Sequence, residues 1–225
     1  TLISRYKKMA RELKTSIEKY FVATIDGFDT YRYYDGNDVL RSWICVPLCM
    51  GIFDRSKGTI DALFSPQLWT GQGLLTQAGS TTFWDRSTLY GLRGVFAAGA
   101  TKKGLKYLTD YSNHRLLNDH VPYAVEAWPE GNQRHLSAEI ALYCRVITEG
   151  VFGFRPTGLS SFSITPQLPH EWNEMSLKNI VAFGGKKIDL LVSRSGNKLK
   201  VDIVSDAKQV KSIIAENGSK LEIKL

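Results

Sequence analysis

Three glutamates lie close together in the stretch PYAVEAWPEGNQRHLSAE, residues 122 to 139, which runs into a helix-like segment. A positioned glutamate can give or take a proton at a reacting group, and an aromatic wall of low dielectric can tune its carboxylic acid for that work. Glu126 stands two positions before Trp128, and Glu130 follows in the same loop. Both are candidates for acid–base catalysis. The alternative for each is an ordinary solvated acid on a loop.

Glu139, the third acid, has a different setting. It lies one turn inside the helical segment, after His135 and Leu136. An acid in the first turn stabilises the positive end of a helix dipole, and neighbouring charges on a helix can pair. We therefore expect Glu139 to be structural, either at the helix start or in a pair with Arg134 or His135.

Most residues before position 150 follow a helical pattern. Apolar residues recur every three or four positions in five segments, so each segment should bury one face against a core. Pro47 should kink the second segment, because it removes a backbone donor. Long, aromatic-rich loops precede the helices that begin near residues 40, 88 and 135, and long ordered loops often carry function. The five segments are residues 2 to 20, 40 to 53, 87 to 100, 102 to 117 and 134 to 150.

From about residue 160 the apolar period changes to two, and Val and Ile become frequent. This pattern predicts antiparallel strands separated by turns that contain Gly. The expected turns are Gly184-Gly185, Ser195-Gly196-Asn197 and Asn217-Gly218.

The change of period also predicts the domain organisation. A helical block followed by a β block is typical of an α+β chain with two domains, here residues 1–155 and 156–225. Within the second block, Asn217-Gly218 separates VKSIIA from KLEIKL. Asn-Gly between two strand-like runs is a strong hairpin signal, so these two runs are expected to pair.

Composition and charge exclude several classes of protein. The net charge of +7 comes from scattered Lys and Arg, without a basic run or a nucleic-acid motif, so no nucleic-acid partner is expected. No run of about 18 uncharged apolar residues occurs, so no membrane span is expected. Cys45, Cys49 and Cys144 lie in apolar helical runs and should be buried as small hydrophobes. Their spacing does not favour a metal site, and no cofactor is expected.

Three stretches together resemble one enzyme family: VEAWPEGN, HLSAEIALYCRVITEGVFG and SITPQLPHEWNEMSLKNIVAFGGKKIDLLV. With the succession of loops and helices, they look like the C-terminal half of a six-hairpin glycosidase. That family includes glucoamylases, trehalases and the maltose-phosphorylase and rhamnosidase groups. The resemblance implies helical hairpins that form part of an (α/α)6 toroid, followed by a small antiparallel β-sandwich-like domain.

The resemblance also implies which acid does the chemistry. Glucoamylase-like and trehalase-like enzymes carry a catalytic carboxylate in the loop before the last inner helix, with an aromatic residue shortly after it. Glu126 matches that place and Glu130 is its rival, although the Glu-Gln or Glu-Lys pair of glucoamylases is Glu126-Ala127 here. Inverting hydrolysis needs a second carboxylate about 6.5–9.5 Å away. We expect it upstream of Thr1, in a half of the toroid that this chain lacks.

By the same resemblance, the long loops should bind sugar, because aromatic faces suit pyranose rings and polar side chains suit hydroxyls. Each candidate also has a structural alternative. A Trp is often a core anchor, Asp35 can serve a turn, and Asp85 can form a capping box with Thr82. His135 can simply be hydrogen bonded. The candidate substrate-binding residues are Tyr34, Asp35, Trp69, Trp84, Asp85, Trp128 and His135.

The resulting hypothesis is a fragment of a glycoside hydrolase that cleaves an oligo- or polysaccharide with inversion. The alternatives are a disaccharide phosphorylase and a non-catalytic carbohydrate-binding or structural module. Because the chain starts TLISRYKK, without an initiator Met, we expect a piece of a longer protein. Such a piece should be inactive alone, and should self-associate or be completed by the missing half. By resemblance, the compartment is periplasmic or extracellular.

Overall fold

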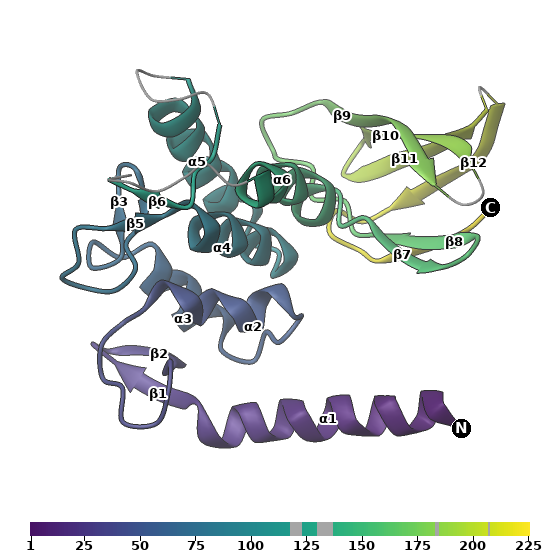
Figure 1. Cartoon of the computed structure of the whole chain (residues 1–225). Coiled ribbons are helices and arrows are strands. Elements are labelled where there is room, and N and C mark those ends of the chain that lie inside the picture. Colours follow the sequence, from purple (N-terminus) through teal and green to yellow (C-terminus); the bar gives the residue numbers. More distant parts are fainter. Residues whose placement is uncertain (118–122, 130–136, 183–184, 207) are drawn as a thin grey trace.

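The computed structural model describes residues 1–117, 123–129, 137–182, 185–206 and 208–225. Helices dominate up to residue 151 and strands dominate after it (Figure 1). The helices are α1 (Leu2–Tyr20), α2 (Val46–Cys49), α3 (Ser56–Leu63), α4 (Asp85–Ala97), α5 (Thr101–Tyr111) and α6 (Ser137–Arg145), with a 3-10 turn η1 (Ser42–Cys45) and π-helical turns η2 (Ser112–Leu116) and η3 (Val146–Val151).

Within the described residues, the strands form two larger sheets and three short ladders. One sheet has the order β12-β11-β10-β9, the other β13-β8-β7, and the ladders are β1-β2, β3-β4 and β5-β6. All of these pairings are antiparallel. The strands are β1 (Val22–Ile25), β2 (Phe28–Tyr31), β3 (Trp69–Thr70), β4 (Gly73–Leu74), β5 (Phe83–Trp84), β6 (Ala127–Trp128), β7 (Arg155–Gly158), β8 (Ser161–Ile164), β9 (Glu174–Ala182), β10 (Lys186–Ser195), β11 (Lys198–Ser205), β12 (Lys208–Ala215) and β13 (Leu221–Lys224).

The four-stranded sheet follows the predicted two-residue period. In β11, Leu199, Val201 and Ile203 are buried and alternate with more exposed residues. β10 and β11 pair from Ser195↔Lys198 onward, and Gly196 adopts a φ of +64° in the turn between them. The hairpin predicted at Ser195-Gly196-Asn197 is therefore confirmed, because Gly accepts the left-handed conformation without steric cost.

The hairpin predicted at Asn217-Gly218 is wrong. β12 pairs with β11, whereas β13 pairs with β8 in the other sheet. The Asn217 side chain accepts a hydrogen bond from the Leu168 N–H at 2.9 Å and donates one to the Leu168 carbonyl at 3.0 Å. These bonds direct the chain from one sheet to the other, so the left-handed turn at Gly218 serves a crossover.

Two hydrophobic clusters meet at α4, which has Val95 and Phe96 fully buried. One cluster joins α4, α5 and α6 to the strands of both sheets, and the other lies among α2, α3 and β1. Gly94 allows α2 to approach α4 closely, because a Cβ there would lie 2.7 Å from the Leu48 Cβ. The division into domains at 155/156 stays a prediction.

The cysteine prediction is confirmed only in part. Cys45 and Cys49 are buried and unbridged, whereas Cys144 on α6 is exposed. Cys144 lies in an apolar stretch of sequence but on the outer side of its helix. An apolar neighbourhood in sequence therefore does not ensure burial.

The predicted fold class, with helical hairpins forming part of an (α/α)6 toroid and a β-sandwich-like domain, is wrong. Residues 40–53 do not form one kinked helix: they contain the 3-10 turn η1 and the single turn α2, which includes Pro47. The long loops contain two-stranded ladders, and the helices range from one turn to 19 residues. The apolar period predicts that a helix face is buried, but it carries no information on how helices assemble.

Helix α1 is a rod attached to the rest of the molecule at its C-terminal end (Figure 1). Near that end Glu18 accepts a hydrogen bond from the Tyr31 hydroxyl at 2.6 Å. None of the α1 residues is buried. The predicted apolar stripe forms, but among the described residues it is covered only near the attached end, where Ile17 is half-buried. Its large side chains are 49–68% exposed at Leu2, Tyr6, Met9, Leu13 and Tyr20.

Gly58 lies where α3 contacts β2, and its lack of a side chain makes that contact close. A Cβ at this position would overlap the backbone carbonyl of Asp29. We expect Gly58→Ala to lower the free energy of unfolding by about 1–3 kcal/mol through overpacking. Gly71→Ala is the matched control, because a Cβ there would meet no atom within 4 Å. Urea denaturation of both variants measures the difference, and equal stability would contradict a tight α3–β2 contact.

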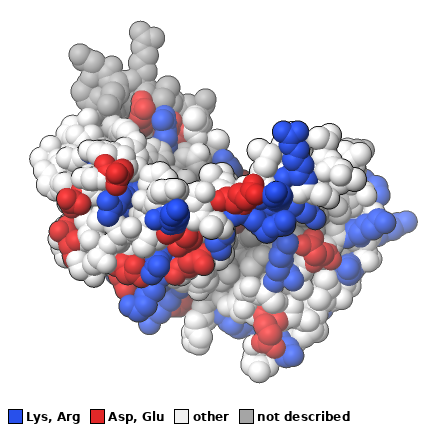
Figure 2. Space-filling model, turned by 90° about the horizontal axis from the view of Figure 1, so that it is seen from below, with Lys and Arg blue, Asp and Glu red and all other residues white. Residues whose placement is uncertain are grey.

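Charged side chains of both signs are intermixed on the face seen from below (Figure 2). Asp61, for example, binds Lys57 at 3.0 Å and Lys103 at 2.5 Å. The positive net charge is therefore not gathered into one basic surface on this face. Among the described residues, no helix has the length and apolar character needed to cross a membrane.

Glu149 connects η3 to α4 and α6 through two arginines. Its carboxylate accepts hydrogen bonds from Arg93 at 2.7 Å and from the Arg145 Nε at 2.5 Å. Burial raises the pKa of Glu149, but the hydrogen bond from Arg145 and the positive charges of Arg93 and Arg145 outweigh it. The pKa of Glu149 therefore lies below its ordinary value of 4.5.

When folding lowers the pKa of an acid, its ionised form stabilises the folded chain at pH values above the unfolded-state pKa. This stabilisation is lost as the pH falls through the folded-state pKa. Wild type should therefore be more stable than Glu149→Gln at neutral pH, and the difference should shrink below pH 4.5. Urea denaturation of both proteins at pH 7 and at about pH 3 measures it. A difference that does not change with pH would contradict the ion-pair account.

Candidate functional site

The loop that carries Glu126 is held against the start of α4. β5 precedes α4 directly, and β6 follows Glu126. The two strands pair at Phe83↔Trp128 and Trp84↔Ala127. This short ladder places the loop of residues 123–129 at the helix N-terminus.

Asp85, the first residue of α4, binds the same loop from behind. Its Oδ2 accepts a hydrogen bond from the Val125 N–H at 2.8 Å and lies 3.1 Å from the Arg115 Nη2. Asp85 and Arg115 are each 1% exposed, so this is a buried ion pair. Asp85 does not close the predicted capping box with Thr82, because the N-cap of α4 is Trp84 and has no side-chain cap bond.

Tyr111, one turn before Arg115, is fully buried beside this ion pair. Burial raises the pKa of Tyr111 well above its ordinary value, and the negative charge of Asp85 adds to the effect. The phenol therefore stays neutral at physiological pH. Asp85 thus holds the loop through Val125, and Arg115 balances its charge.

Arg86 binds two glutamates at once, one exposed and one buried. Its Nη2 lies 3.2 Å from the Glu126 Oε1, and its Nε lies 2.6 Å from the Glu139 Oε1. The Glu126 side chain is 33% exposed and the Glu139 side chain 0%. The hydrogen bond to Glu139 is the main cause that raises the pKa of Arg86. Arg86 is therefore fixed by the buried Glu139 and holds the Glu126 carboxylate at the surface.

Glu139 lies in the first turn of α6, as predicted, but its described partner is Arg86 and not a neighbour in sequence. One of its oxygens, Oε2, has no hydrogen-bond partner within the described parts of the chain. The pair joins α6 to α4. A structural role agrees with this geometry.

Aromatic side chains lie next to this acid–arginine cluster. Trp84 packs edge to face on Trp43, with ring centroids 5.5 Å apart, and Trp43 lies 6.0 Å from Tyr90. Trp69 belongs to a separate cluster, 5.4 Å from Phe64 and 4.7 Å from Tyr107. The backbone of Trp84 pairs with Ala127, the residue after Glu126, whereas Trp69 has the packing of a core anchor.

Tyr34 and Asp35 lie on the exposed loop after β2. The Asp35 carboxylate is fully exposed and lies 3.4 Å from an Arg32 nitrogen. The Arg41 guanidinium lies over the Tyr33 and Tyr34 rings, 5.1 Å and 5.9 Å from their centroids. These interactions stay within that loop and Arg41. The role of Tyr34 and Asp35 in substrate binding stays a prediction.

Two predicted site residues, Glu130 and His135, lie outside the described residues. Trp128 contributes the backbone pairing of β6. Among the residues that are described, no group of three or more His, Cys, Asp or Glu could hold a metal ion.

Sequence reasoning missed Arg86 and Arg115, the two cations of the site. Arg86 is adjacent to Asp85 in the sequence, which could have drawn attention to it. Arg115 lies on a helical stripe with Tyr111 and Leu108, so its position favoured burial, and a buried Arg requires an acidic partner. The pattern gave no means to identify that partner, which lies 30 residues away.

Comparisons with known proteins bear on the fold. No family model matches the sequence, and no curated protein matches it. The fold is similar to that of a sialidase. A solved structure named "Sialidase" superposes with a TM-score of 0.71 at 17% sequence identity, covering 98% of this chain and 24% of the sialidase chain.

At 17% identity, the sialidase neighbour shows a shared fold and no more. Our chain spans 24% of the neighbour's length, and the match extends over both the helices and the sheets. This likeness gives no support to the six-hairpin toroid that the sequence resemblance implied.

Proposed function

We propose that this chain is part of a glycoside hydrolase that cleaves glycosidic bonds of an oligo- or polysaccharide. The sialidase neighbour, itself a glycoside hydrolase, supports the general class. The observation that carries the proposal is the setting of Glu126: a surface carboxylate held by Arg86, in a loop tied to the buried Asp85–Arg115 pair.

In this proposal Glu126 is the general base of an inverting reaction. Arg86 lies 3.2 Å from the Glu126 carboxylate and positions it, and a general base must be held in a fixed position to act on water. The general acid then comes from a part of the protein outside this chain, about 6.5–9.5 Å away. Glu130 is the rival for the role of Glu126.

The substrate is proposed to lie over Trp84 and Trp128, whose aromatic rings suit the apolar face of a sugar. Tyr34, Asp35 and His135 would bind hydroxyl groups. Trp69 is half-buried and would support the site through packing. Asp85 is buried and would support it by holding the loop that carries Glu126.

The uncovered apolar stripe of α1 supports a further part of the proposal, that additional polypeptide packs on this chain. Large exposed apolar surfaces usually mark interaction sites. Self-association of the isolated chain is the alternative occupant. Light scattering on the purified 225-residue chain distinguishes a monomer from an oligomer.

The proposal is tested by assaying the complete protein against a panel of aryl glycosides and oligosaccharides, with NMR detection of the first-formed anomer. We expect hydrolysis with inversion. Cleavage that requires phosphate would favour a disaccharide phosphorylase instead. Binding without turnover across the panel would favour a non-catalytic carbohydrate-binding module.

A further inference from the structure

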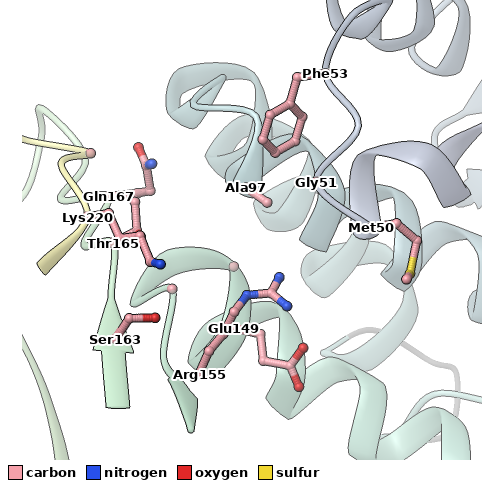
Figure 3. A pocket seen from close by; sticks show the side chains of 13 residues that line it. Met50, Gly51, Phe53, Ala97, Glu149, Arg155, Ser163, Thr165, Gln167 and Lys220 are labelled. Carbon is pink, nitrogen blue, oxygen red and sulfur yellow. The ribbon is translucent and has the colours of Figure 1, made fainter. Parts of the chain in front are cut away.

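A cavity lies between the helical part and the β part of the chain, and Glu126 is not among its lining residues (Figure 3). Its volume is about 460 Å³, within the range typical of small-molecule sites. Met50, Phe53 and Ala97 line the helical side, and residues of β7, β8 and the segments around β13 line the other. The cavity is therefore large enough for one monosaccharide-sized molecule.

Buried polar side chains line the β side of this cavity. Ser163 is 2% exposed and lines the cavity. Gln167 is 5% exposed, and its Oε1 accepts a hydrogen bond from the Thr101 hydroxyl at 2.7 Å. This bond orients the amide and leaves its NH2 group as a donor. Polar side chains that line a cavity can form hydrogen bonds with a bound molecule.

The charges around the cavity favour an anion. Arg155 lines it and forms no ion pair with any acid in the described ranges, and Figure 3 shows its guanidinium beside Glu149. Glu149 is already bound by Arg93 and Arg145, at 2.7 Å and 2.5 Å. Lys220, also in the lining, is paired with Glu222 at 2.6 Å. The charge of Arg155 also acts on Glu149, but among the described residues Arg155 makes no ion pair within 4 Å, so its guanidinium can bind a ligand.

We propose that this cavity binds a small hydroxylated carboxylate the size of a sugar acid. Arg155 binds the carboxylate, since a guanidinium matches its two oxygens. The Ser163 hydroxyl and the Gln167 amide bind hydroxyl groups, because both can form such bonds. Met50 and Phe53 contact the apolar face of the sugar-acid ring. This site is distinct from that of Glu126 and does not depend on the proposed hydrolase activity.

Isothermal titration of the 225-residue chain with glucuronate tests the proposal, with glucose and inorganic phosphate as comparison ligands. We expect saturable binding of glucuronate, at least tenfold tighter than that of either comparison ligand. Arg155→Met and Ser163→Ala should each weaken it about tenfold, the effect of losing one hydrogen bond to a ligand. Lys208→Met, an exposed cation on β12, is the matched control and should bind as wild type does.

Several results would overturn the proposal. Absence of saturable glucuronate binding by folded wild type, or unchanged affinity in folded Arg155→Met, would do so. Phosphate binding as tight as glucuronate would indicate non-specific attraction of anions, and equal glucose binding would remove the role of the carboxylate. Thermal melting verifies that each variant is folded. Arg155 is exposed on β7, so Arg155→Met decides the test even if Ser163→Ala does not fold.

Discussion

Replacing Arg115 with Met is expected to lower the free energy of unfolding by about 3–5 kcal/mol, because it leaves the Asp85 carboxylate buried without its cation. The two groups lie 3.1 Å apart, and both are 1% exposed. Asp85 also holds the Val125 N–H, so the loop that carries Glu126 should loosen as well.

Chemical denaturation of the 225-residue chain measures this loss. Arg11→Met on the exposed face of α1 is the matched control and should change stability by less than about 0.5 kcal/mol. Hydrogen exchange at the Val125 amide reports on the loop, and exchange should accelerate in Arg115→Met. A variant as stable as the control would contradict the account of a buried ion pair that holds the loop.

Replacing Glu126 with Gln in the complete protein is expected to lower kcat by about 10²–10⁴-fold, the usual contribution of a general base. Gln keeps the size of the side chain and a hydrogen-bond acceptor for Arg86, so the loop should stay in place and KM should change little. Glu171→Gln, at an exposed glutamate in the chain segment after β8, is the matched control. A kcat equal to that of the control would contradict a catalytic role for Glu126.

The local structure of the chain was largely predictable from its sequence. The helical period identified α1 and α4, and the two-residue period identified the strands from β8 onward. These patterns reflect which side of an element is buried, and that preference is visible within a dozen residues. α3 and β7 were missed, because both are short and lack a clear period.

The assembly of these elements was not predictable in the same way. Asn217-Gly218 has the sequence of a hairpin turn, yet two hydrogen bonds to Leu168 make it a crossover between sheets. The partner lies 49 residues away, so no local pattern contains it. The toroid prediction failed for a related reason, since it came from the resemblance of short stretches to a family, and such stretches do not show how helices pack together.

Part of the candidate site was predictable from the sequence, and part was not. Glu126 and Trp128 could be chosen as candidates because they lie two positions apart in the sequence. The groups that position the acid are Asp85, Arg86 and Arg115, which come from another part of the chain. Asp85 was noted as a cap or a sugar ligand, but its partners became evident only when the folded chain placed them within 3.1 Å.

The most direct test of the central claim is azide rescue of Glu126→Ala in the complete protein. A general base activates water by removing a proton, so an anionic nucleophile that needs no deprotonation can replace the lost function. We predict that Glu126→Ala loses hydrolysis, and that azide restores cleavage and forms a glycosyl azide of inverted configuration. If Glu126→Ala hydrolysed the substrate at the wild-type rate without azide, the assignment of Glu126 as the base would be contradicted.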